Sequence, residues 1–519
     1  MTDPPTADPN GGQDVLPFPN LIVFVSNACI MTVELVAGRI VAPFLGVSLY
    51  TWTSVIGVVL AGISAGNYVG GRLADRHASR RFLGLIFLIA GLCTLSILWT
   101  APLLGRNLAP AALPLWARIV LLIGAVFFIP SAAMGGISPV VVKLALRNLE
   151  RSGNIVGQIY AYSALGSIVG TFATGFFLIA WLGTRTIVLG VGILLICLGL
   201  LIGRWASRAL SQALVAGVAV AVFITAPGRW VPDDPCLRES QYYCIKVRDE
   251  TLDDGSQVKV LILDRLVHSY TSPEDPTKLV YGYEKVYAEV AQYVGEQRPN
   301  LRALFIGGGG YTFPRFLEAI YPESQLDVVE IDPEVTAIAR EMLGLSPQSR
   351  IRVFHQDARQ FLLEAPPDLT YDLIIGDAFN DYSVPYHLTT LEFDELVLAH
   401  LGTDGIYMVN LIDGRHLQFI SAYVRTLQRV FPHVYVIPVG LSWRDAVRST
   451  FVVIGSRTPV DLERLQALDG GDGAYHVRSW LLSPEAVREL SQAGSAVELT
   501  DDYVPVDHLL APVFVESER

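Results

Sequence analysis

The first part of the chain is a succession of long apolar stretches. Between about Phe18 and Pro227, each stretch is long enough to cross a hydrocarbon core of about 30 Å as a helix of about 20 residues. The pattern therefore predicts a multi-pass α-helical membrane domain at residues 18–230, with about seven helices. The predicted spans are residues 19–44, 50–71, 82–102, 116–142, 155–182, 185–203 and 209–226.

After Trp230 the apolar runs shorten to the length of strands and soluble helices. Tyr242–Arg248 and Gln257–His268 alternate between apolar and polar residues as strands do, and the turn sequence Asp253–Gly255 separates them. Such a pair predicts a β-hairpin. We expect a small β-domain with a linking helix at residues 231–300.

From Leu301 onward, strand-like runs alternate with amphipathic helices. This alternation is typical of a mostly parallel, doubly wound sheet. We predict an α/β Rossmann-like domain at residues 301–456 and a C-terminal extension at 457–519, whereas the polar residues 1–17 suggest a disordered tail. The predicted strands lie in LRALFIGGGG, QLDVVEID, IRVFHQD, YDLIIGDAF, GIYMVNLID, HVYVIPVG and STFVVIGS.

Composition and charge narrow the function. With 51% hydrophobic and 17% charged residues, the chain is too apolar for a purely soluble protein. The formal net charge of -12 argues against a nucleic-acid partner, which requires a basic face. An acidic surface suits a cationic substrate such as a polyamine, although many soluble proteins are acidic for solubility alone.

The cysteines fall into two groups. Cys29, Cys93 and Cys197 lie within apolar stretches, where a thiol behaves as a small hydrophobic group. Cys236 and Cys244 follow the last apolar stretch and are separated by only seven residues. A local disulfide is expected there if the region is oxidising, and a reduced pair if it is not.

Ligands of doubly wound sheets lie at the carboxyl ends of the strands, so these positions carry the candidate chemistry. After the first strand, Gly307, Gly308 and Gly309 allow a ligand close to the backbone, and the next helix offers its N-terminal amides. Glu330 ends the second strand about 20 residues later, where a carboxylate accepts from the hydroxyls of a ribose. Together they predict a nucleoside site.

The third and fourth strands end in further carboxylates. Asp357 accepts from an adenine amino group or caps the helix that starts at Ala358, and the two roles are compatible. Asp377 and Asp381 form a carboxylate pair that would hold a substrate ammonium and take its proton, because a protonated amine has no lone pair for alkylation. The alternative is a helix cap followed by a solvated loop.

Residues from about Glu239 to Ser456 resemble the spermidine synthase (polyamine aminopropyltransferase) family. The matching stretches are VLILDRLVHSY, VYGYEKVYAEV, ALFIGGGG, VVEIDPEV, FHQDARQFL and YDLIIGDAF, in the order of the family. The resemblance implies a small β-domain before a Rossmann-like domain of the methyltransferase type. It also implies transfer of an aminopropyl group from decarboxylated S-adenosylmethionine to a polyamine, without a metal.

The same resemblance implies roles for individual residues. Glu330 would bind the ribose of the nucleoside, Asp357 its adenine, and Asp377 the reacting amine. Tyr283 and His268 would lie near the substrate pocket. Soluble members of the family are often oligomeric, so a homo-oligomer stays open for this chain.

The chain also departs from the family pattern. Gly310 stands where the glycine loop of the family has an aspartate, which is expected to hold the aminopropyl amine of the donor. Asp381 is one residue late, and His268 replaces the usual glutamine. Loss of the loop carboxylate removes repulsion against ordinary S-adenosylmethionine, so a methyltransferase is an alternative. A transporter or sensor whose soluble domain binds nucleoside or polyamine without catalysis is a second alternative.

Two further segments resemble known proteins. Gly70–Arg81 resembles the cytoplasmic loop between the second and third helices of major facilitator transporters, and a basic loop that obeys the positive-inside rule is the alternative. The C-terminal LTDDYVPVDHLLAPVF resembles the tail of spermidine synthase homologues fused to a membrane domain. Asp501, Asp502 and Tyr503 could reach the pocket, but a structural strand or anchoring segment is the favoured interpretation.

Basic residues predict the orientation of this multi-pass cell-membrane protein. Nine Lys or Arg residues occur in the second-third, fourth-fifth and sixth-seventh loops and three in the alternate loops, which places the N-terminus inside. Seven spans then put the soluble domain outside the cytoplasm, although adenosylmethionine-type donors are made inside, so the side stays open. The nine are Arg72, Arg76, Arg80, Arg81, Lys143, Arg147, Arg151, Arg204 and Arg208, and the three are Arg106, Arg118 and Arg185.

Overall fold

The computed structural model of this 519-residue chain describes residues 16–46, 49–107, 115–146, 152–204, 236–379 and 384–517. The chain divides into two compact units, Met1–Asp234 and Pro235–Arg519, and each is described by itself. Most of the predicted N-terminal tail and the predicted seventh span at residues 209–226 lie outside the described residues.

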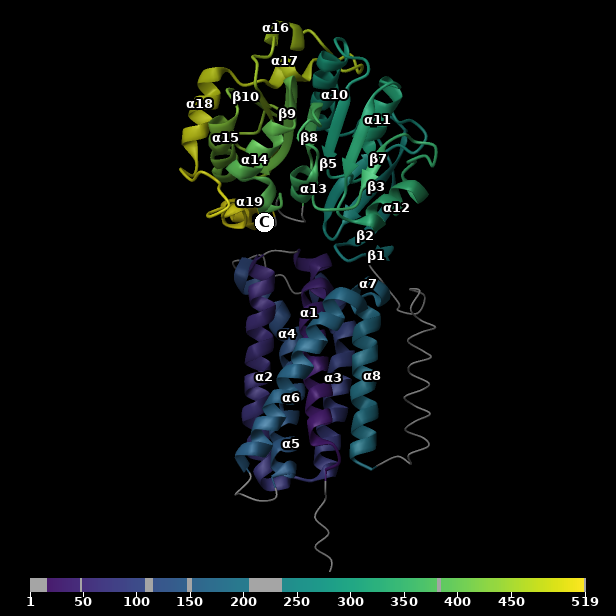
Figure 1. Cartoon of the computed structure of the whole chain (residues 1–519), viewed down its shortest axis with the longest axis vertical. Helices are drawn as coiled ribbons and strands as arrows, with labels where there is room; N and C mark the ends of the chain where they lie inside the picture. Colours follow the sequence, from purple (N-terminus) through teal and green to yellow (C-terminus); the bar gives the residue numbers. More distant parts are fainter. Residues whose placement is uncertain are drawn as a thin grey trace, which may run out of the picture. The chain divides into compact units, whose positions relative to one another are not determined.

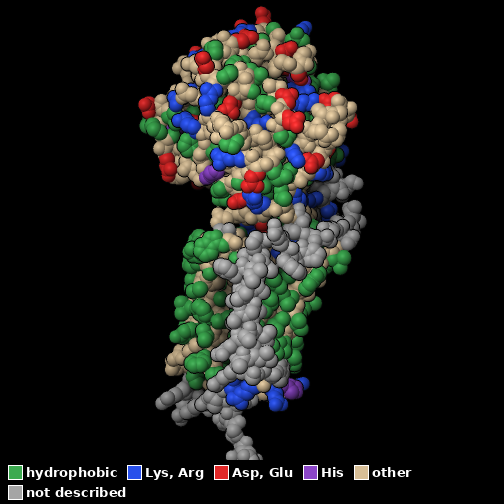
Figure 2. Space-filling view, turned by 90° about the vertical axis from the view of Figure 1, so that its right-hand side faces the viewer, with side chains coloured by type: hydrophobic (Ala, Val, Ile, Leu, Met, Phe, Trp, Pro, Cys, Tyr) green, Lys and Arg blue, Asp and Glu red, His purple; other side chains and the backbone are tan. Residues whose placement is uncertain are grey.

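The described part of the N-terminal unit is helical (Figure 1). Six helical segments are long and apolar enough to cross a membrane, by length and composition. They agree with the first six predicted spans, and Figure 2 shows mainly hydrophobic side chains along this unit, with Lys and Arg gathered at one end. The elements are α1 Pro19–Leu45, α2 Leu49–His77, α3 Arg80–Asn107, α4 Leu115–Gly135, α5 Ile137–Ala145, α6 Ser152–Ala173, the π-helical η2 Thr174–Leu178, α7 Ile179–Leu182 and α8 Thr184–Ile202.

Glycines bring three pairs of these helices into close contact. A Cβ at Gly62 would lie 2.8 Å from the Phe128 carbonyl oxygen, which fixes the spacing of α2 and α4. An added Cβ at Gly91 on α3 would lie 2.6 Å from a backbone oxygen of α8. An added Cβ at Gly170 on α6 would likewise lie 2.6 Å from a backbone oxygen of α1. Small residues are the usual means by which membrane helices approach one another.

The segment Gly70–Arg81 is mostly helix rather than loop, which corrects the sequence-based expectation. Helix α2 continues to His77 and α3 begins at Arg80. Gly70 lies against the junction of α4 and α5, since an added Cβ there would lie 2.7 Å from the Gly136 Cα. Asp75 forms a 2.8 Å ion pair with Lys143 of α5.

The C-terminal unit begins with a four-stranded antiparallel sheet in the order β1-β2-β3-β4. The predicted hairpin is present, and Gly255 adopts a φ of 81° in its turn. Gln257–His268 is not one strand as expected, because Asp264 takes a left-handed conformation and reverses the chain between β3 and β4. The strands are β1 Arg238–Glu239, β2 Cys244–Thr251, β3 Gln257–Leu263 and β4 Leu266–Thr271.

Helix α10 (Gly282–Gly295) leads into a seven-stranded sheet in the order β10-β11-β9-β8-β5-β6-β7. The strands β7, β6, β5, β8 and β9 are parallel, and β11 is antiparallel to both of its neighbours. This is the predicted methyltransferase-type Rossmann arrangement. The elements are β5 Arg302–Ile306, α11 Thr312–Ile320, β6 Gln325–Val329, α12 Pro333–Met342, β7 Arg352–Phe354, α13 Ala358–Glu364, β8 Tyr371–Gly376, the 3-10 helix η3 Tyr386–Leu388, α14 Leu391–Ala399, β9 Leu401–Asp413, α15 Gln418–Val430, β10 His433–Pro438 and β11 Ser449–Ser456.

Helices cover both faces of this sheet (Figure 1). Phe305 and Ile375 point into the core beneath α10, α11 and α12, and their strand neighbours Leu304 and Ile374 point into the core beneath α13, α14 and α15. Alternation along buried strands therefore builds two hydrophobic layers. Residues after Ser456 form α16 Leu462–Leu465, α17 His476–Trp480, α18 Pro484–Ala493 and α19 Val506–Ser517.

Candidate active site

The parallel strands β5, β6 and β8 end at the same edge of the sheet, and the loop at this edge is made of glycine. Gly307 has a φ of 98° and Gly309 one of 49°, which glycine adopts without strain. A Cβ at Gly307 would also lie 2.6 Å from the Asp377 carbonyl oxygen after β8. The glycines therefore allow the first and fourth strand ends to meet.

Glu330 at the end of β6 organises this glycine loop. Its Oε2 accepts hydrogen bonds from the Gly308 N–H at 2.8 Å and the Gly309 N–H at 3.3 Å, and its Oε1 accepts from the Asp332 N–H at 2.9 Å. The side chain is buried, and burial raises the pKa of Glu330 above its ordinary value. Its role toward a ribose stays a prediction.

Asp357 caps a helix and binds a histidine. Its Oδ1 accepts from the Gln360 N–H at 3.0 Å, so the predicted N-cap of α13 is confirmed, and its Oδ2 lies 2.7 Å from His387 Nε2. The hydrogen bond to His387 lowers the pKa of Asp357. Arg359 donates to the His387 carbonyl oxygen at 3.3 Å and forms an ion pair with Asp501 at 2.5 Å, so Asp501 has a structural role here.

A cavity of about 290 Å³ lies among these groups. Two tyrosines of the small β-domain, Tyr242 and Tyr243, line it opposite the strand ends. We refer to it as the nucleoside cavity, after the ligand that the sequence predicts for these residues. Its polar lining residues include Gly307, Gly309, Glu330, Asp357, Asp377 and His387.

Asp377 is the buried carboxylate after β8. Asn410 Nδ2 donates to its Oδ1 at 2.8 Å, and the hydroxyl of Tyr283 donates a second hydrogen bond. Burial raises the pKa of Asp377 to about 6, and the two hydrogen bonds oppose this shift. The carboxylate is therefore mainly ionised at neutral pH and close to the range in which it accepts a proton.

A second cavity of about 100 Å³ also has Asp377 in its lining, and we call it the amine cavity, after the substrate that the sequence predicts for Asp377. Burial, followed by the charge of Asp377, raises the pKa of Glu284 to about 8, and burial lowers that of His268 to about 4. Among the described residues, three buried polar atoms have no hydrogen-bond partner here: His268 Nε2, the Tyr287 hydroxyl and Asn410 Oδ1. The cavity therefore offers polar groups to a ligand.

The two cavities share His268, Gly307, Gly309, Asp377 and Phe379 in their lining. A carboxylate thus lies where a molecule in the nucleoside cavity would meet a molecule in the amine cavity. This is the arrangement that a group transfer between two bound molecules requires.

The structure brings together Gly307, Gly308, Gly309, Glu330, Asp357, Asp377, Tyr283 and His268, whereas Asp381 lies outside the described residues. The sequence interpretation missed Asn410, Glu284, Tyr287, His387 and Tyr243. Asn410 sits in the fifth parallel strand, so applying the strand-end rule to that strand would have identified it. Tyr243 follows no motif, because only folding of the hairpin brings it to the cavity.

In the described part of the chain, no group of three His, Cys, Asp or Glu residues is arranged to hold a metal ion.

Residues 284–443 match the family model described as "Spermine/spermidine synthase domain". The match lies within the C-terminal unit, and we refer to the matched region by the name of the model, as the synthase domain. Glu284, the glycine loop, Glu330, Asp357 and Asp377 all lie within this match.

Relatives of the synthase domain carry two kinds of name. A polyamine aminopropyltransferase of Vibrio vulnificus is 37% identical over 142 residues, 27% of this chain and 46% of that protein. A polyamine aminopropyltransferase of Corynebacterium efficiens is 26% identical over 386 residues, 68% of this chain and 69% of that protein. An eEF1A lysine and N-terminal methyltransferase of Mus musculus is 30% identical over 146 residues, 26% of this chain and 20% of that protein.

The chain spans less than half the length of the first curated relatives that it matches. The names of the aminopropyltransferases agree with the transferase class predicted from the sequence.

Proposed function

We propose that this protein is a membrane-integrated transferase that moves an aminopropyl group from decarboxylated S-adenosylmethionine to an amine of a polyamine. The observation that carries the proposal is the position of Asp377 in the lining of both cavities. The names of the aminopropyltransferase relatives support the same reaction class. No metal takes part in the proposed reaction.

The proposed chemistry is a displacement at carbon. The lone pair of the acceptor amine attacks the aminopropyl carbon next to the sulfonium, and the carbon–sulfur bond breaks with its electrons moving to sulfur. The products are methylthioadenosine and the alkylated amine. Asp377 accepts the proton that the nitrogen loses, and its raised pKa suits this role.

In the nucleoside cavity, Glu330 and Asp357 are the proposed ligands of ribose and adenine. Glu330 already accepts from three backbone amides, so it is held rigidly, and Oδ2 of Asp357 is oriented by His387. Preorganised carboxylates of this kind bind hydroxyl and amino donors without loss of side-chain entropy on binding. A cationic amine would be attracted by the ionised Asp377.

The N-terminal unit is proposed to hold this domain in a lipid bilayer. The six apolar helical segments support membrane integration, and the alignment with the Corynebacterium efficiens relative is too long to be confined to the C-terminal unit. The likeness to facilitator transporters stays a prediction. Homo-oligomerisation is an open prediction as well, which mass measurement of the purified protein tests.

Methyl transfer from S-adenosylmethionine is a second candidate, favoured by the surroundings of Gly310. A Cβ there would overlap Ser269 Oγ and lie 2.6 Å from Thr271 Oγ1. Thr271 Oγ1 is itself 2.6 Å from Thr312 Oγ1. Hydroxyl groups therefore fill the place where the family pattern has an aspartate, and the mouse relative carries the name of a methyltransferase.

The deciding experiment is calorimetric titration of the detergent-purified protein with decarboxylated S-adenosylmethionine, S-adenosylmethionine and methylthioadenosine, followed by product analysis with a polyamine. Preference for the decarboxylated donor, together with formation of methylthioadenosine, supports aminopropyl transfer. Preference for the carboxylated donor with formation of S-adenosylhomocysteine replaces it by methyl transfer. Ligand binding without product, or no binding, indicates a non-catalytic transporter or sensor.

A further inference from the structure

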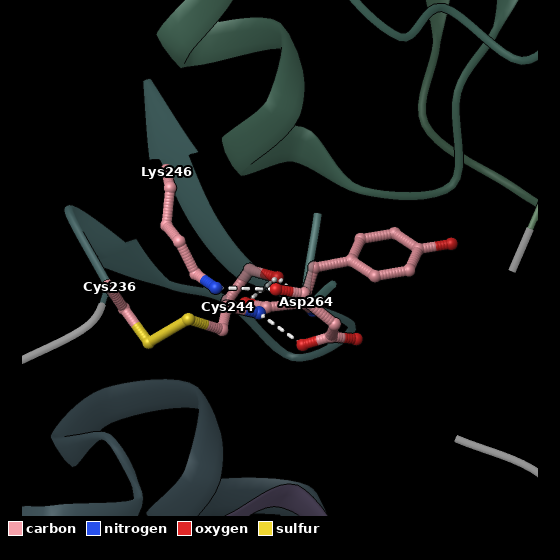
Figure 3. The surroundings of a disulfide bond; sticks show 6 residues. Cys236, Cys244, Lys246 and Asp264 are labelled. Carbon is pink, nitrogen blue, oxygen red and sulfur yellow. Dashed lines mark hydrogen bonds between the residues drawn. A yellow bond between two sulfur atoms is a disulfide. The ribbon is translucent and has the colours of Figure 1, made fainter. Parts of the chain in front are cut away.

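A disulfide closes the first loop of the C-terminal unit. Cys236 and Cys244 are bonded, with their Cα atoms 5.2 Å apart (Figure 3). The Cys244 N–H donates to Asp264 Oδ1 at 2.9 Å, and Lys246 donates to the Asp264 carbonyl oxygen at 2.5 Å. One end of the bridge is therefore anchored in β2 and in the β3–β4 turn, as Figure 3 shows.

The other end of the bridge holds a very short strand. β1 consists of Arg238 and Glu239 and pairs with β2 at only two positions. β1 also lies at the edge of its sheet. Two residues of edge strand give little stability by themselves, and the disulfide is the one covalent constraint that ties this loop to β2.

Residues inside the bridged loop contact the end of β6 in the synthase domain. Ser240 Oγ donates to Asp332 Oδ2 at 2.5 Å, and Asp332 follows Glu330 by two residues. Arg238 forms ion pairs with Glu334 at 3.1 Å and Glu341 at 2.9 Å on α12. The loop is thus fastened beside the proposed ribose ligand.

The same loop supplies the wall of the nucleoside cavity. The Tyr243 N–H donates to Ser240 Oγ at 2.9 Å, which fixes the backbone of the tyrosine to the contact with Asp332. The ring of Tyr243 has its centroid 6.4 Å from that of His268. Tyr242 and Tyr243 both line the cavity, and Tyr243 precedes Cys244 directly in the chain.

We propose that Tyr243 is a donor-binding residue that the Cys236–Cys244 disulfide holds in position, so that nucleoside binding depends on the oxidised bridge. The proposal rests on the proposed function, because it takes the occupant of the cavity to be an adenosine-type donor. Opening the bridge removes the covalent constraint and leaves β1 and Ser240 held by non-covalent contacts alone, and we expect the tyrosine ring then to lose its fixed place beside the base and ribose.

The redox step is an ordinary thiol–disulfide exchange. Reduction adds two electrons and two protons to the bridge and gives two thiols, while dithiothreitol is oxidised to its cyclic disulfide. Formation of the bridge requires a thiol–disulfide oxidant, as is found in oxidising compartments. The other three cysteines of the sequence, Cys29, Cys93 and Cys197, belong to the N-terminal unit, so reduction changes one bond in the synthase unit.

The test is titration of the full-length, detergent-purified protein with methylthioadenosine before and after dithiothreitol. A thiol count verifies reduction, and the melting temperature verifies that the protein remains folded. We expect Kd to rise at least tenfold on reduction. In turnover assays KM for the donor should rise while kcat at saturating donor changes less than twofold, because Asp377 is not touched.

Variants separate the bridge from a general loss of structure. The double variant Cys236→Ser/Cys244→Ser should bind as weakly as the reduced protein and should not respond to dithiothreitol. Tyr243→Ala should weaken binding to the same extent with the bridge intact. Cys93→Ser is the control and should behave as the unchanged protein, including its loss of affinity on reduction.

The outcomes that overturn the inference differ from those that overturn the proposed function. If the fully reduced, folded protein binds methylthioadenosine with a Kd within twofold of the oxidised protein, the role of the bridge is wrong while the proposed function stands. Unchanged binding by Tyr243→Ala would likewise remove the role of the tyrosine. Absence of nucleoside binding by the oxidised protein contradicts both.

Discussion

Asn410 on β9 donates a 2.8 Å hydrogen bond from Nδ2 to Oδ1 of Asp377, the carboxylate that ends the neighbouring strand β8. The Asn410 Oδ1 is buried and has no partner among the described residues, and it lines the amine cavity. One amide therefore holds the proposed base by its donor and offers its acceptor to an incoming ammonium group.

Asp377→Asn should abolish turnover and leave donor binding within about threefold. The amide keeps the shape of the side chain but accepts no proton. Because burial raises the pKa of Asp377 in the folded state, ionisation of this group opposes folding as the pH rises from about 4 through about 6. The variant should therefore be as stable as the parent at pH 7, or more stable by about 1–3 kcal/mol. Product assays, calorimetry and thermal unfolding check this, and turnover at the parent rate would exclude Asp377 as the base.

The pH dependence of the proposed reaction should follow Asp377. Only the ionised carboxylate accepts a proton, so kcat/KM should rise with pH through about 6 and then level off. Asn410→Ala removes a hydrogen bond that favours the ionised form of Asp377, so the pH midpoint of this rise should increase by about one pH unit. Ile412→Val, in the same strand and cavity, is the control and should leave the midpoint unchanged. An unchanged midpoint in Asn410→Ala would mean that another group titrates.

Glu330→Gln should weaken binding of methylthioadenosine at least tenfold, about 1.4 kcal/mol. The new amide nitrogen is a donor, and in either orientation it would face backbone N–H groups that now donate to the carboxylate, those of Gly308 and Gly309 or that of Asp332. The measurement is calorimetric titration, with thermal unfolding to verify the fold. The exposed Glu323→Gln serves as control and should bind as the parent does. Equal affinity of Glu330→Gln would contradict the assignment of the nucleoside cavity.

Gly310→Ala should lower the free energy of unfolding by about 1–3 kcal/mol, because a Cβ overlaps Ser269 Oγ. Gly402→Ala is a milder control, since its Cβ would lie 3.3 Å from the nearest atom. For the same steric reason, restoring the carboxylate of the family pattern with Gly310→Asp should not increase aminopropyl transfer. A folded Gly310→Asp variant with higher aminopropyl transfer would show that the site tolerates the side chain.

The seven-span prediction puts the synthase domain on the side of the membrane opposite to the basic loops, whereas six spans would put it on the same side. In intact cells, a membrane-impermeant maleimide should label Leu441→Cys, whose parent side chain is 83% exposed in the C-terminal unit. Arg76→Cys at the end of α2 should stay unlabelled until the cells are opened, because the positive-inside rule places this end in the cytoplasm. The reverse labelling would place the synthase domain in the cytoplasm and make a stable Cys236–Cys244 bridge unexpected there.

Local pattern identified most of the architecture in advance. Long apolar runs predicted six membrane-length segments that the structure describes, and alternating strands and helices predicted the doubly wound sheet. Glu330, Asp357 and Asp377 were identified because a carboxyl group at the end of a parallel strand always faces the same edge of the sheet. The prediction of a single strand at Gln257–His268 was wrong, because the alternation of apolar and polar residues does not reveal that Asp264 adopts a left-handed conformation and divides the segment into β3 and β4.

What the sequence by itself determined was the type and order of the elements and the side chains at their ends, because hydrophobic period, glycine placement and strand direction act over a few residues. Tertiary structure alone decided which of these side chains meet. Asn410 reaches Asp377 because β9 pairs with β8, His387 reaches Asp357 across 30 positions, and Ser269 closes the space beside Gly310. Tyr243 lines the nucleoside cavity in a structure in which the bridged loop is fastened to Asp332. Such contacts join segments whose separation along the chain carries no local signal, so packing of the whole domain selects them.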